Sequence, residues 1–311
     1  MSENNRISAG TLDALVAAGL DPAGVVRLIV AAVEEDLAGG VDVTSVATVP
    51  YDQRSAMDLV NRVPGVIAGV PVVAAVFEYV GGEGVDVAAI CQDGTATAAD
   101  SVLMQIAGDT RSLLTAERTA LNVFGHLSGI ATLTAAWVAA VAGTDAVIRD
   151  TRKTQPGLRA LEKYAVRCGG GMNHRMSLSD AALVKDNHVA AAGGVGRAFA
   201  KVRQQFPGVP VEVEVDTLDQ LGEVLAAGAD LVLLDNFTVA ETAQAVQLTA
   251  GRAKLEASGG LSLDNAAEVA ATGVDYLAVG ALTHSAAVLD IGADLSPLGP
   301  DEESRFAMGV R

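Results

Sequence analysis

The sequence predicts an α/β protein in which parallel strands form a barrel and a smaller α+β domain comes first. From residue 146 onward, short β-rich runs alternate with Ala-rich amphipathic runs, as in strand–helix units with parallel strands and right-handed crossovers. The first 115 residues instead combine helical patterns with short strands separated by turn signals. No G-x-G-x-x-G follows a first strand, so the pattern favours a barrel over a dinucleotide-binding sheet.

Within the first 115 residues, dipeptides such as Pro64-Gly65 and Asp93-Gly94 mark turns. The helices expected there span 12–18 and 23–37, and the strands span 54–60, 65–68, 85–91 and 101–107. A long helical pattern over 112–141 then joins this region to the barrel. It contains no proline, and Gly125 and Gly129 indicate close packing or a bend rather than an end.

The barrel region supplies six strand–helix units. Its expected strands span 146–150, 182–185, 211–215, 231–235, 254–258 and 276–280, and its expected helices span 158–168, 195–206, 218–227, 240–248 and 265–271. In such barrels, residues at the carboxyl ends of the strands and on the following loops form the active site. Candidate functional residues are therefore sought at those positions.

Composition limits the classes of function. Half of the 311 residues are hydrophobic and 19% are charged, which suffices for a sizeable core. The net charge of −17 argues against nucleic acid or an anionic membrane as a partner, because both would repel the chain. The apolar run from Ala68 to Phe77 is too short to cross a bilayer, and the first ten residues do not resemble a signal peptide. Two cysteines, Cys91 and Cys168, fit a reducing cytoplasm.

A basic stretch nevertheless lies inside this acidic chain. Between Arg111 and Lys185 there are ten Lys and Arg residues against five Asp and Glu residues. Arg152 and Lys153 follow the first barrel strand, where a forked guanidinium and a point charge can clamp a carboxylate or phosphate. A triple-glycine loop then leads to His174 and Arg175, and Lys185 ends the second strand. The same pattern also fits a solvated, salt-bridged surface.

The strand 211–215 alternates valine with glutamate, so Glu212 and Glu214 share one face. Outer faces of barrel strands pack on helices, which places the valines outside and the glutamates in the lumen. An edge strand with a wet face is the alternative. Glu214 lies nearer the carboxyl end, and Asp235 has the matching place on the next strand. Two such carboxylates suit Mg²⁺ held beside a diphosphate.

Small residues end the last two strands. Ser258 and Gly259 follow one strand, and Gly280 follows the other, with His284 four residues later. Free backbone N–H groups at such positions, followed by helix starts, can hold a phosphate. Ordinary turn glycines are the alternative.

In their order and spacing, these motifs resemble the quinolinate phosphoribosyltransferase family over nearly the whole chain. No single motif is specific, but the set is. The motifs are Glu35 to Leu37, Asp42 to Ser45, Gly65 to Gly69, Glu117 to Asn122, Leu127 to Thr132, Asp150 to Pro156, Gly170 to Arg175, Lys185 to His188, Glu212 to Asp216, Leu234 to Asn236, Ser258 to Gly260 and Gly280 to His284.

The resemblance implies an incomplete (β/α) barrel over residues 130–287, beside a smaller α+β open-sandwich domain formed by 1–129 plus 288–311. It implies a pentosyltransferase, the carboxylating nicotinate-nucleotide diphosphorylase of NAD biosynthesis, with quinolinate and 5-phosphoribosyl 1-diphosphate as substrates and Mg²⁺ as cofactor. It further implies a cytoplasmic homodimer with shared active sites, or a higher oligomer.

Carried over residue by residue, the resemblance also implies roles. Quinolinate would be bound by Arg118 (reaching the partner subunit's site), Arg152, His174, Arg175 and Lys185. The phosphoribosyl diphosphate would contact Lys153, Glu214, Asp235, Ser258, Gly259, Gly280 and His284. Glu214 and Asp235 would hold the metal, and these two carboxylates with Lys153 and Lys185 would carry catalysis. One departure is Asp100, which stands where the family usually has a turn glycine.

Three other functions stay open on the sequence alone. The first is a related phosphoribosyltransferase acting on another pyridine or small acid. The second is an aldolase barrel in which Lys185 forms a Schiff base. The third is a phosphate-binding scaffold that has lost catalysis, against which the full set of charged residues argues.

Overall fold

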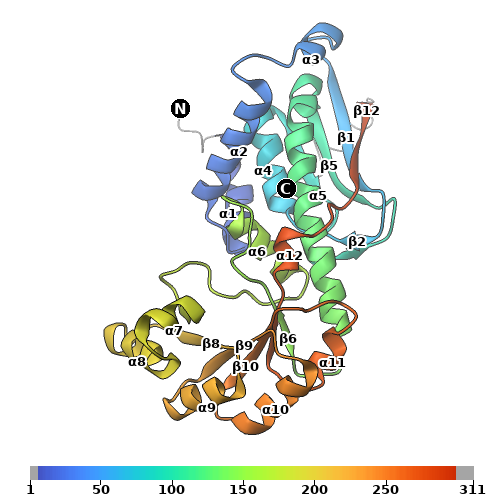
Figure 1. The fold of residues 1–311 in the computed structure, drawn as a ribbon. Coiled ribbons are helices and arrows are strands. Elements are labelled where there is room, and N and C mark those ends of the chain that lie inside the picture. The colour runs from blue at the N-terminus through green and yellow to red at the C-terminus, as the bar shows by residue number, and fades with distance from the viewer. Residues whose placement is uncertain (1–5, 299–311) are drawn as a thin grey trace. The chain divides into compact units, whose positions relative to one another are not determined.

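The computed structural model describes residues 6–298, which divide into two compact units (Figure 1). The first unit contains residues 6–132, 160–169 and 286–298, and the second contains 133–159 and 170–285. The division expected at 129/130 and 287/288 stays a prediction. The chain passes from one compact unit to the other within a few residues of those positions. Residues 160–169, however, are expected in the barrel and lie in the first unit. The end of the expected sandwich segment, 299–311, lies outside the described residues.

The first unit is built on an antiparallel sheet with the strand order β12-β1-β5-β3. Its strands are β1 (Arg54–Asn61), β3 (Asp86–Ala89), β5 (Val102–Asp109) and β12 (Ile291–Pro297), and β2 (Gly65–Val66) pairs with β4 (Ala96–Thr97). The helices are α1 (Ala9–Ala17), α2 (Pro22–Leu37), α3 (Val43–Thr48), α4 (Val70–Gly81) and α6 (Arg159–Cys168), with the short 3₁₀ turn η2 (Gly82–Gly84). Helix α4 packs on β3 and β5 and contacts α1 and α2.

Helix α4 was not predicted, although its residues include most of the apolar run noted in the sequence. The helix is apolar almost all round, and seven of its twelve residues are buried. A helix buried on every side shows no amphipathic period, so its pattern resembles neither a surface helix nor an alternating strand. The tertiary contacts of α4 therefore decide its conformation.

Helix α5 (Thr110–Ala140) is the predicted long helix. Its buried residues Leu113, Ala116, Ala120, Phe124 and Leu127 follow the helical spacing of three and four. By length and composition α5 could cross a membrane, as could α1 and α2 taken as one bent span, but 50% of the apolar window of α5 is buried in the structure. Core helices of water-soluble proteins have the same character.

The expectation of close packing at the two glycines of α5 is confirmed. A Cβ on Gly125 would lie 2.8 Å from the Leu289 carbonyl oxygen, and one on Gly129 would lie 2.0 Å from that of Ala287. The segment leading into β12 thus runs against α5 at a separation that only glycine permits. It brings the C-terminal strand, which the residue pattern did not reveal, back to the edge of the first sheet.

Asp100 adopts the left-handed conformation, with φ of 60°, and its backbone N–H donates to the Asn61 carbonyl at 2.8 Å. The turn therefore has the positive φ that a glycine would take without cost, and aspartate is among the few other residues that tolerate it. The departure from the family pattern leaves the turn intact.

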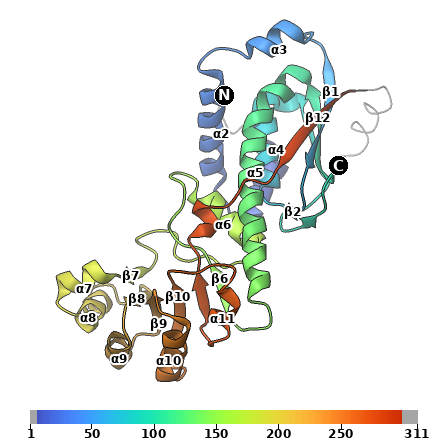
Figure 2. The same cartoon turned by 45° about the vertical axis from the view of Figure 1, so that its right-hand side comes forward.

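The second unit is a six-stranded parallel sheet in the order β6-β11-β10-β9-β8-β7, with helices on its outer face (Figures 1 and 2). Its strands are β6 (Val147–Arg149), β7 (Ala182–Val184), β8 (Val211–Val215), β9 (Leu231–Asp235), β10 (Lys254–Ser258) and β11 (Tyr276–Ala278). Its helices are α7 (Asp186–Ala192), α8 (Val195–Gln205), α9 (Leu218–Ala226), α10 (Val239–Thr249), α11 (Ala266–Ala270) and α12 (Ala281–His284). Within residues 6–298 no pairing joins β6 to β7, so the sheet stops short of closing, and Met172 adds one bridge to Arg149 of β6. The predicted fold class, an incomplete barrel beside a smaller domain, is confirmed.

The alternation predicted for β8 also holds. Val211, Val213 and Val215 are buried, and α8 and α9 pack on this strand. Glu212 is 3% exposed and contacts His174, while Glu214 contacts Lys185. The glutamates therefore point to the interior of the barrel and are paired there, as burial of a carboxylate requires.

A pair of Gly→Ala substitutions tests the close approach at α5. Gly129→Ala forces the Ala287 backbone to shift and should cost about 1–3 kcal/mol, whereas Gly222→Ala in α9, with no atom within 4 Å of its new methyl, should stabilise by up to about 1 kcal/mol. Thermal melting of both variants measures the difference. Equal melting temperatures would contradict the described packing.

Candidate active site

A cavity of about 520 Å³ opens at the carboxyl ends of the barrel strands, entirely within the second unit. Its volume suits a small ligand. It is lined by Thr151, Arg152, Lys153, His174, Arg175, Leu183, Lys185, Glu214, Leu233, Asp235, Asn236, Glu256, Ser258, Gly259 and Ala278. Nine of the twelve predicted site residues are in this set, so groups separated by more than 100 residues converge on one place.

Two guanidinium groups form the cationic part of the cavity. Arg175 is held through Nη1, which donates to the Ala181 carbonyl at 2.9 Å. Within residues 6–298, the Nε atoms of both Arg152 and Arg175 are buried and have no hydrogen-bond partner. Burial, and then the charge of Arg152, lower the pKa of Arg175. Two neighbouring cations with unused donors favour an anionic ligand, because such a ligand would satisfy the donors and reduce the repulsion.

Carboxylates and lysines occupy the neighbouring strand ends. Lys185 Nζ lies 2.6 Å from Glu214 Oε2. Burial, and then the charge of Asp216, raise the pKa of Asp235, while Lys185 and Lys153 lower it. Glu214 and Asp235 end adjacent strands of the sheet. Their oxygen atoms are the donor type that Mg²⁺ prefers, so these residues fit a magnesium site beside a phosphorylated ligand.

The loop after β9 is strained beside the cavity. Asn236 has φ of 57°, and its N–H donates to the Ser258 carbonyl at 2.8 Å. A Cβ on Gly259 would lie 2.1 Å from Asn236 Oδ1, and Gly259 itself has φ of 83°. Left-handed non-glycine residues persist where surrounding contacts impose them, often at ligand sites. Only glycine fits at 259.

Gly280 and His284 do not line the cavity but adjoin it. A Cβ on Gly280 would lie 3.0 Å from Lys153 Cδ and 3.2 Å from His284 Nε2. Thr283 Oγ1 also donates to the Lys153 carbonyl at 2.8 Å. These contacts connect the start of α12 to the lysine that does line the cavity. Arg118 lies on α5 in the first unit, outside this cavity.

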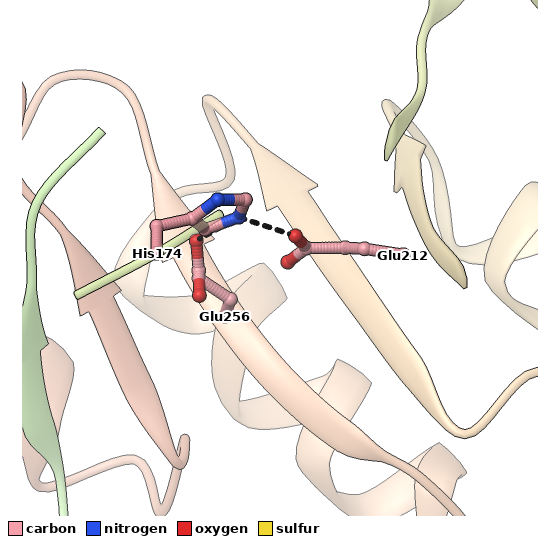
Figure 3. Close-up of side chains that lie close together, drawn as sticks. All are labelled: His174, Glu212 and Glu256. Carbon is pink, nitrogen blue, oxygen red and sulfur yellow. Dashed lines mark hydrogen bonds and ion pairs between the residues drawn. The ribbon is translucent and has the colours of Figure 1, made fainter. Parts of the chain in front are cut away.

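Two lining residues, His174 and Glu256, belong to a buried hydrogen-bonded cluster (Figure 3). His174 Nε2 lies 2.5 Å from Glu212 Oε2 and 3.6 Å from Glu256 Oε1. Arg149 Nη1 lies 2.5 Å from Glu256 Oε2, and the Arg149 guanidinium lies over the Tyr276 ring, 4.6 Å from its centre. Burial, and then the charge of Glu212, raise the pKa of Glu256 to about 7. Burial and the Glu212 carboxylate thus favour the protonated form of Glu256, while the Arg149 guanidinium favours the charged form.

The sequence analysis missed Glu256, Arg149 and Asn236 as site residues. A signal was present for two of them, since Glu256 alternates with Leu255 and Ala257, and Arg149 follows Ile148, so both share the inward face of their strands. Their pairing joins strands more than 100 residues apart, and no local pattern reveals it. Asn236 carries no signal for its left-handed conformation.

Comparison with known proteins agrees with this geometry. Residues 42–128 match the model of the quinolinate phosphoribosyl transferase N-terminal domain, and residues 130–294 match that of the C-terminal domain. The nicotinate-nucleotide pyrophosphorylase [carboxylating] of Mycobacterium leprae is 56% identical over 85% of this chain and 94% of its own length. The chain belongs to the quinolinate phosphoribosyl transferase family. The resemblance predicted from the sequence is confirmed.

Other members of the quinolinate phosphoribosyl transferase family are similar over most of their length. The chloroplastic nicotinate-nucleotide pyrophosphorylase [carboxylating] of Arabidopsis thaliana is 37% identical over 94% of this chain and 86% of its own. The crystal structure of NadC from Streptococcus pyogenes, 40% identical, has a TM-score of 0.86 and covers 90% of this chain and 99% of that one. Human nicotinic acid phosphoribosyltransferase, 13% identical with a TM-score of 0.56, shares the fold.

The raised pKa of Glu256 gives a prediction about stability. The folded protein holds a proton on Glu256 that the unfolded chain releases near its ordinary pKa of 4.5, so the group costs stability increasingly as the pH rises from 4.5 through 7. Glu256→Gln imitates the protonated acid and keeps an acceptor for Arg149. Its melting temperature relative to wild type should be higher at pH 8 than at pH 5. A pH-independent difference would contradict the assignment.

Proposed function

We propose that this protein transfers the phosphoribosyl group of 5-phosphoribosyl 1-diphosphate to quinolinate with loss of CO₂, giving nicotinate mononucleotide and diphosphate. The observation that carries the proposal is the cavity itself. It combines two guanidiniums with unused buried donors and two carboxylates at adjacent strand ends, in a family whose named members are carboxylating nicotinate-nucleotide pyrophosphorylases.

The cations bind quinolinate in this proposal. Quinolinate carries two adjacent carboxylates, and Arg152 and Arg175 present forked donors that match them. Lys185 adds a third positive charge, which Glu214 holds in place at 2.6 Å. Because the two guanidiniums repel one another, binding a dianion between them is favoured over binding a neutral pyridine.

The remaining lining residues bind the phosphoribosyl diphosphate. Lys153 contacts the diphosphate, and Ser258, Gly259, Gly280 and His284 hold the 5′-phosphate end with hydroxyl, ring and backbone N–H groups. Glu214 and Asp235 contact the ribose and hold Mg²⁺. When bound, the metal offsets negative charge on the leaving diphosphate.

The reaction follows from these positions. The quinolinate nitrogen attacks the anomeric carbon as the bond to diphosphate breaks, and Glu214 and Asp235 stabilise the positive charge that develops on the sugar. The ring nitrogen becomes cationic, so it stabilises the electron pair that stays on C2 when the neighbouring carboxylate departs as CO₂. A proton from solvent then completes the product. The cations chiefly hold two mutually repelling anions together.

The assembly belongs to the proposal as well. We propose a homodimer or higher oligomer in which Arg118 reaches the partner subunit's quinolinate site. A cytoplasmic location fits the two free cysteines, although plant relatives carry chloroplastic or mitochondrial names.

A Schiff-base aldolase is the competing function, and the ion pair of Lys185 argues against it. Lys185 Nζ is paired with the Glu214 carboxylate at 2.6 Å, whereas a Schiff base needs an amine that is free to attack a carbonyl carbon. Borohydride trapping with a carbonyl substrate should leave Lys185 unlabelled.

The direct test of the proposed function is release of CO₂ from carboxyl-labelled quinolinate with phosphoribosyl diphosphate and Mg²⁺. We expect CO₂ and nicotinate mononucleotide in equal amounts, dependent on all three components. Nicotinate in place of quinolinate should give no product. Turnover with nicotinate, or none with quinolinate, would refute the assignment.

Arg175→Ala tests the guanidinium clamp, which consists of the Arg152 and Arg175 side chains that bind the quinolinate carboxylates in this proposal. Losing charge-assisted hydrogen bonds of about 1.5–3 kcal/mol should raise the KM for quinolinate roughly 10- to 150-fold, with little change for the other substrate. Arg203→Ala on the exposed side of α8 is the matched control and should leave both KM values unchanged. If the two variants show the same kinetics, Arg175 does not bind quinolinate and the proposed clamp is wrong.

Mixing inactive variants tests the shared site. Subunits carrying Arg118→Ala, mixed and refolded with subunits carrying Lys185→Ala, should recover up to about one quarter of wild-type activity, since random pairing of equal numbers gives half mixed dimers with one intact site each. Native mass spectrometry confirms the mixing. Mixed dimers without activity would contradict a contribution from Arg118 across the interface.

A further inference from the structure

Both ring nitrogens of His174 are already engaged by the protein. Nδ1 accepts the backbone N–H of Arg175 at 2.7 Å, and Nε2 lies 2.5 Å from Glu212 Oε2. A nitrogen that accepts an N–H carries no proton, so the ring proton is on Nε2 and is donated to Glu212. Both ring nitrogens are thus directed at protein atoms, in contacts that fit one tautomer.

The segment around His174 contacts three buried acids, one after β6, one on β8 and one on β10. Asp150, fully buried after β6, accepts the His174 N–H at 2.8 Å and the Asn173 side chain at 2.6 Å. Glu212 on β8 faces the ring, and Glu256 on β10 lies close to it, with Oε1 3.6 Å from Nε2 (Figure 3). These contacts fix the backbone from which the Arg175 guanidinium extends into the cavity.

We propose that His174 is a neutral positioning residue for quinolinate binding, whose tautomer is set by Glu212 and whose Nδ1 fixes the backbone of Arg175. This inference rests on the proposed function. It differs from the role that the family resemblance implied, in which His174 joins the cations that bind the carboxylates. The contacts of the ring favour positioning, because its two nitrogens are directed at protein atoms.

A charged imidazolium fits the cluster less well. Its Nδ1–H would point at the N–H of Arg175, so two donors would face one another, and the hydrogen bond that orders the loop would be lost. The groups facing the cluster are Glu212, Glu256, Asp150 and the Arg149 guanidinium, which is bound to Glu256 and lies over Tyr276.

A metal ion fits less well for the same reason. His174, Glu212 and Glu256 offer donor atoms within 4.8 Å of one another. Coordination through Nε2 would move the ring proton to Nδ1, where the Arg175 N–H opposes it. In addition, Glu256 Oε2 is already in contact with Arg149 Nη1 at 2.5 Å. The geometry points to a hydrogen-bonded support for the clamp.

The protonation state can be observed directly in the wild-type protein. The chain has four histidines, so ¹⁵N-histidine labelling gives few signals, and His174→Asn identifies the one of interest. We expect one protonated and one unprotonated ring nitrogen for His174 at pH 7, both free and with quinolinate. Two protonated nitrogens in either state would overturn the proposal. This measurement needs no turnover, so it stands apart from any failure of the proposed function.

Two substitutions separate positioning from direct contact. The shorter amide of His174→Asn keeps an acceptor near the place of Nδ1, while the longer amide of His174→Gln reaches toward Glu212 but has no atom at that place. We expect His174→Asn to keep the KM for quinolinate within about threefold of wild type, and His174→Gln to raise it about tenfold or more, with the other KM unchanged in both. The reverse order, or equal large losses, would favour a direct contact.

Substitutions of Glu212 provide a second, independent test of the positioning role of His174. Glu212→Gln retains an acceptor for Nε2–H and should preserve the KM for quinolinate, whereas Glu212→Leu should raise it about tenfold. The matched control is Glu162→Leu in the first unit, where a fully buried glutamate contacts His126 at 2.9 Å. That variant should lose thermal stability without changing the KM. If Glu212→Leu also changes only stability, Glu212 has a structural role alone and the proposal fails.

Discussion

The site depends on keeping two guanidinium groups beside one another in a partly buried cavity. Like charges in such a place repel, and the lowered pKa of Arg175 reflects both burial and the Arg152 charge. The protein offsets part of the cost of holding these charges together with hydrogen bonds to fixed groups, such as the Ala181 carbonyl. It leaves the Nε donors unused, so the arrangement is completed only by an anionic ligand. Binding energy is thereby directed to dianions.

In the barrel, strands supply the inward carboxylates and loops supply most of the cations. The carboxylates of Glu212, Glu214 and Glu256 come from strands, where register fixes their place and alternation directs them inward. The cations Arg152 and Lys153 come from the loop after β6, and Arg175 comes from the loop between α6 and β7. Parallel strands bring their carboxyl ends together at one edge, so both sets meet in one cavity. The rigid acids can then orient the more adaptable cations.

Sequence reasoning succeeded where one local pattern decides the structure. The bounds of β8, β9 and β10 were predicted to the residue, because alternation and flanking turns define them. It failed where tertiary contacts decide: α4 has no amphipathic period, and α7 begins directly at Asp186, where we expected only the rim of the cavity. Likewise, nothing local assigns 160–169 to the first unit, since that depends on contacts such as the Tyr164 hydroxyl donating to Asp93.

For the site, the sequence predicted which residues converge but not their protonation or partners. Residue type and position place His174 on the rim, and a histidine among arginines invites a cationic role. Whether it is cationic depends on an Arg175 N–H at 2.7 Å and a glutamate 38 residues away. Burial and the charge of Glu212 raise the pKa of Glu256, which favours its protonated form and so reduces the negative charge beside Glu212. A site built to attract anions can thus contain inward carboxylates, provided that cations or shared protons neutralise them.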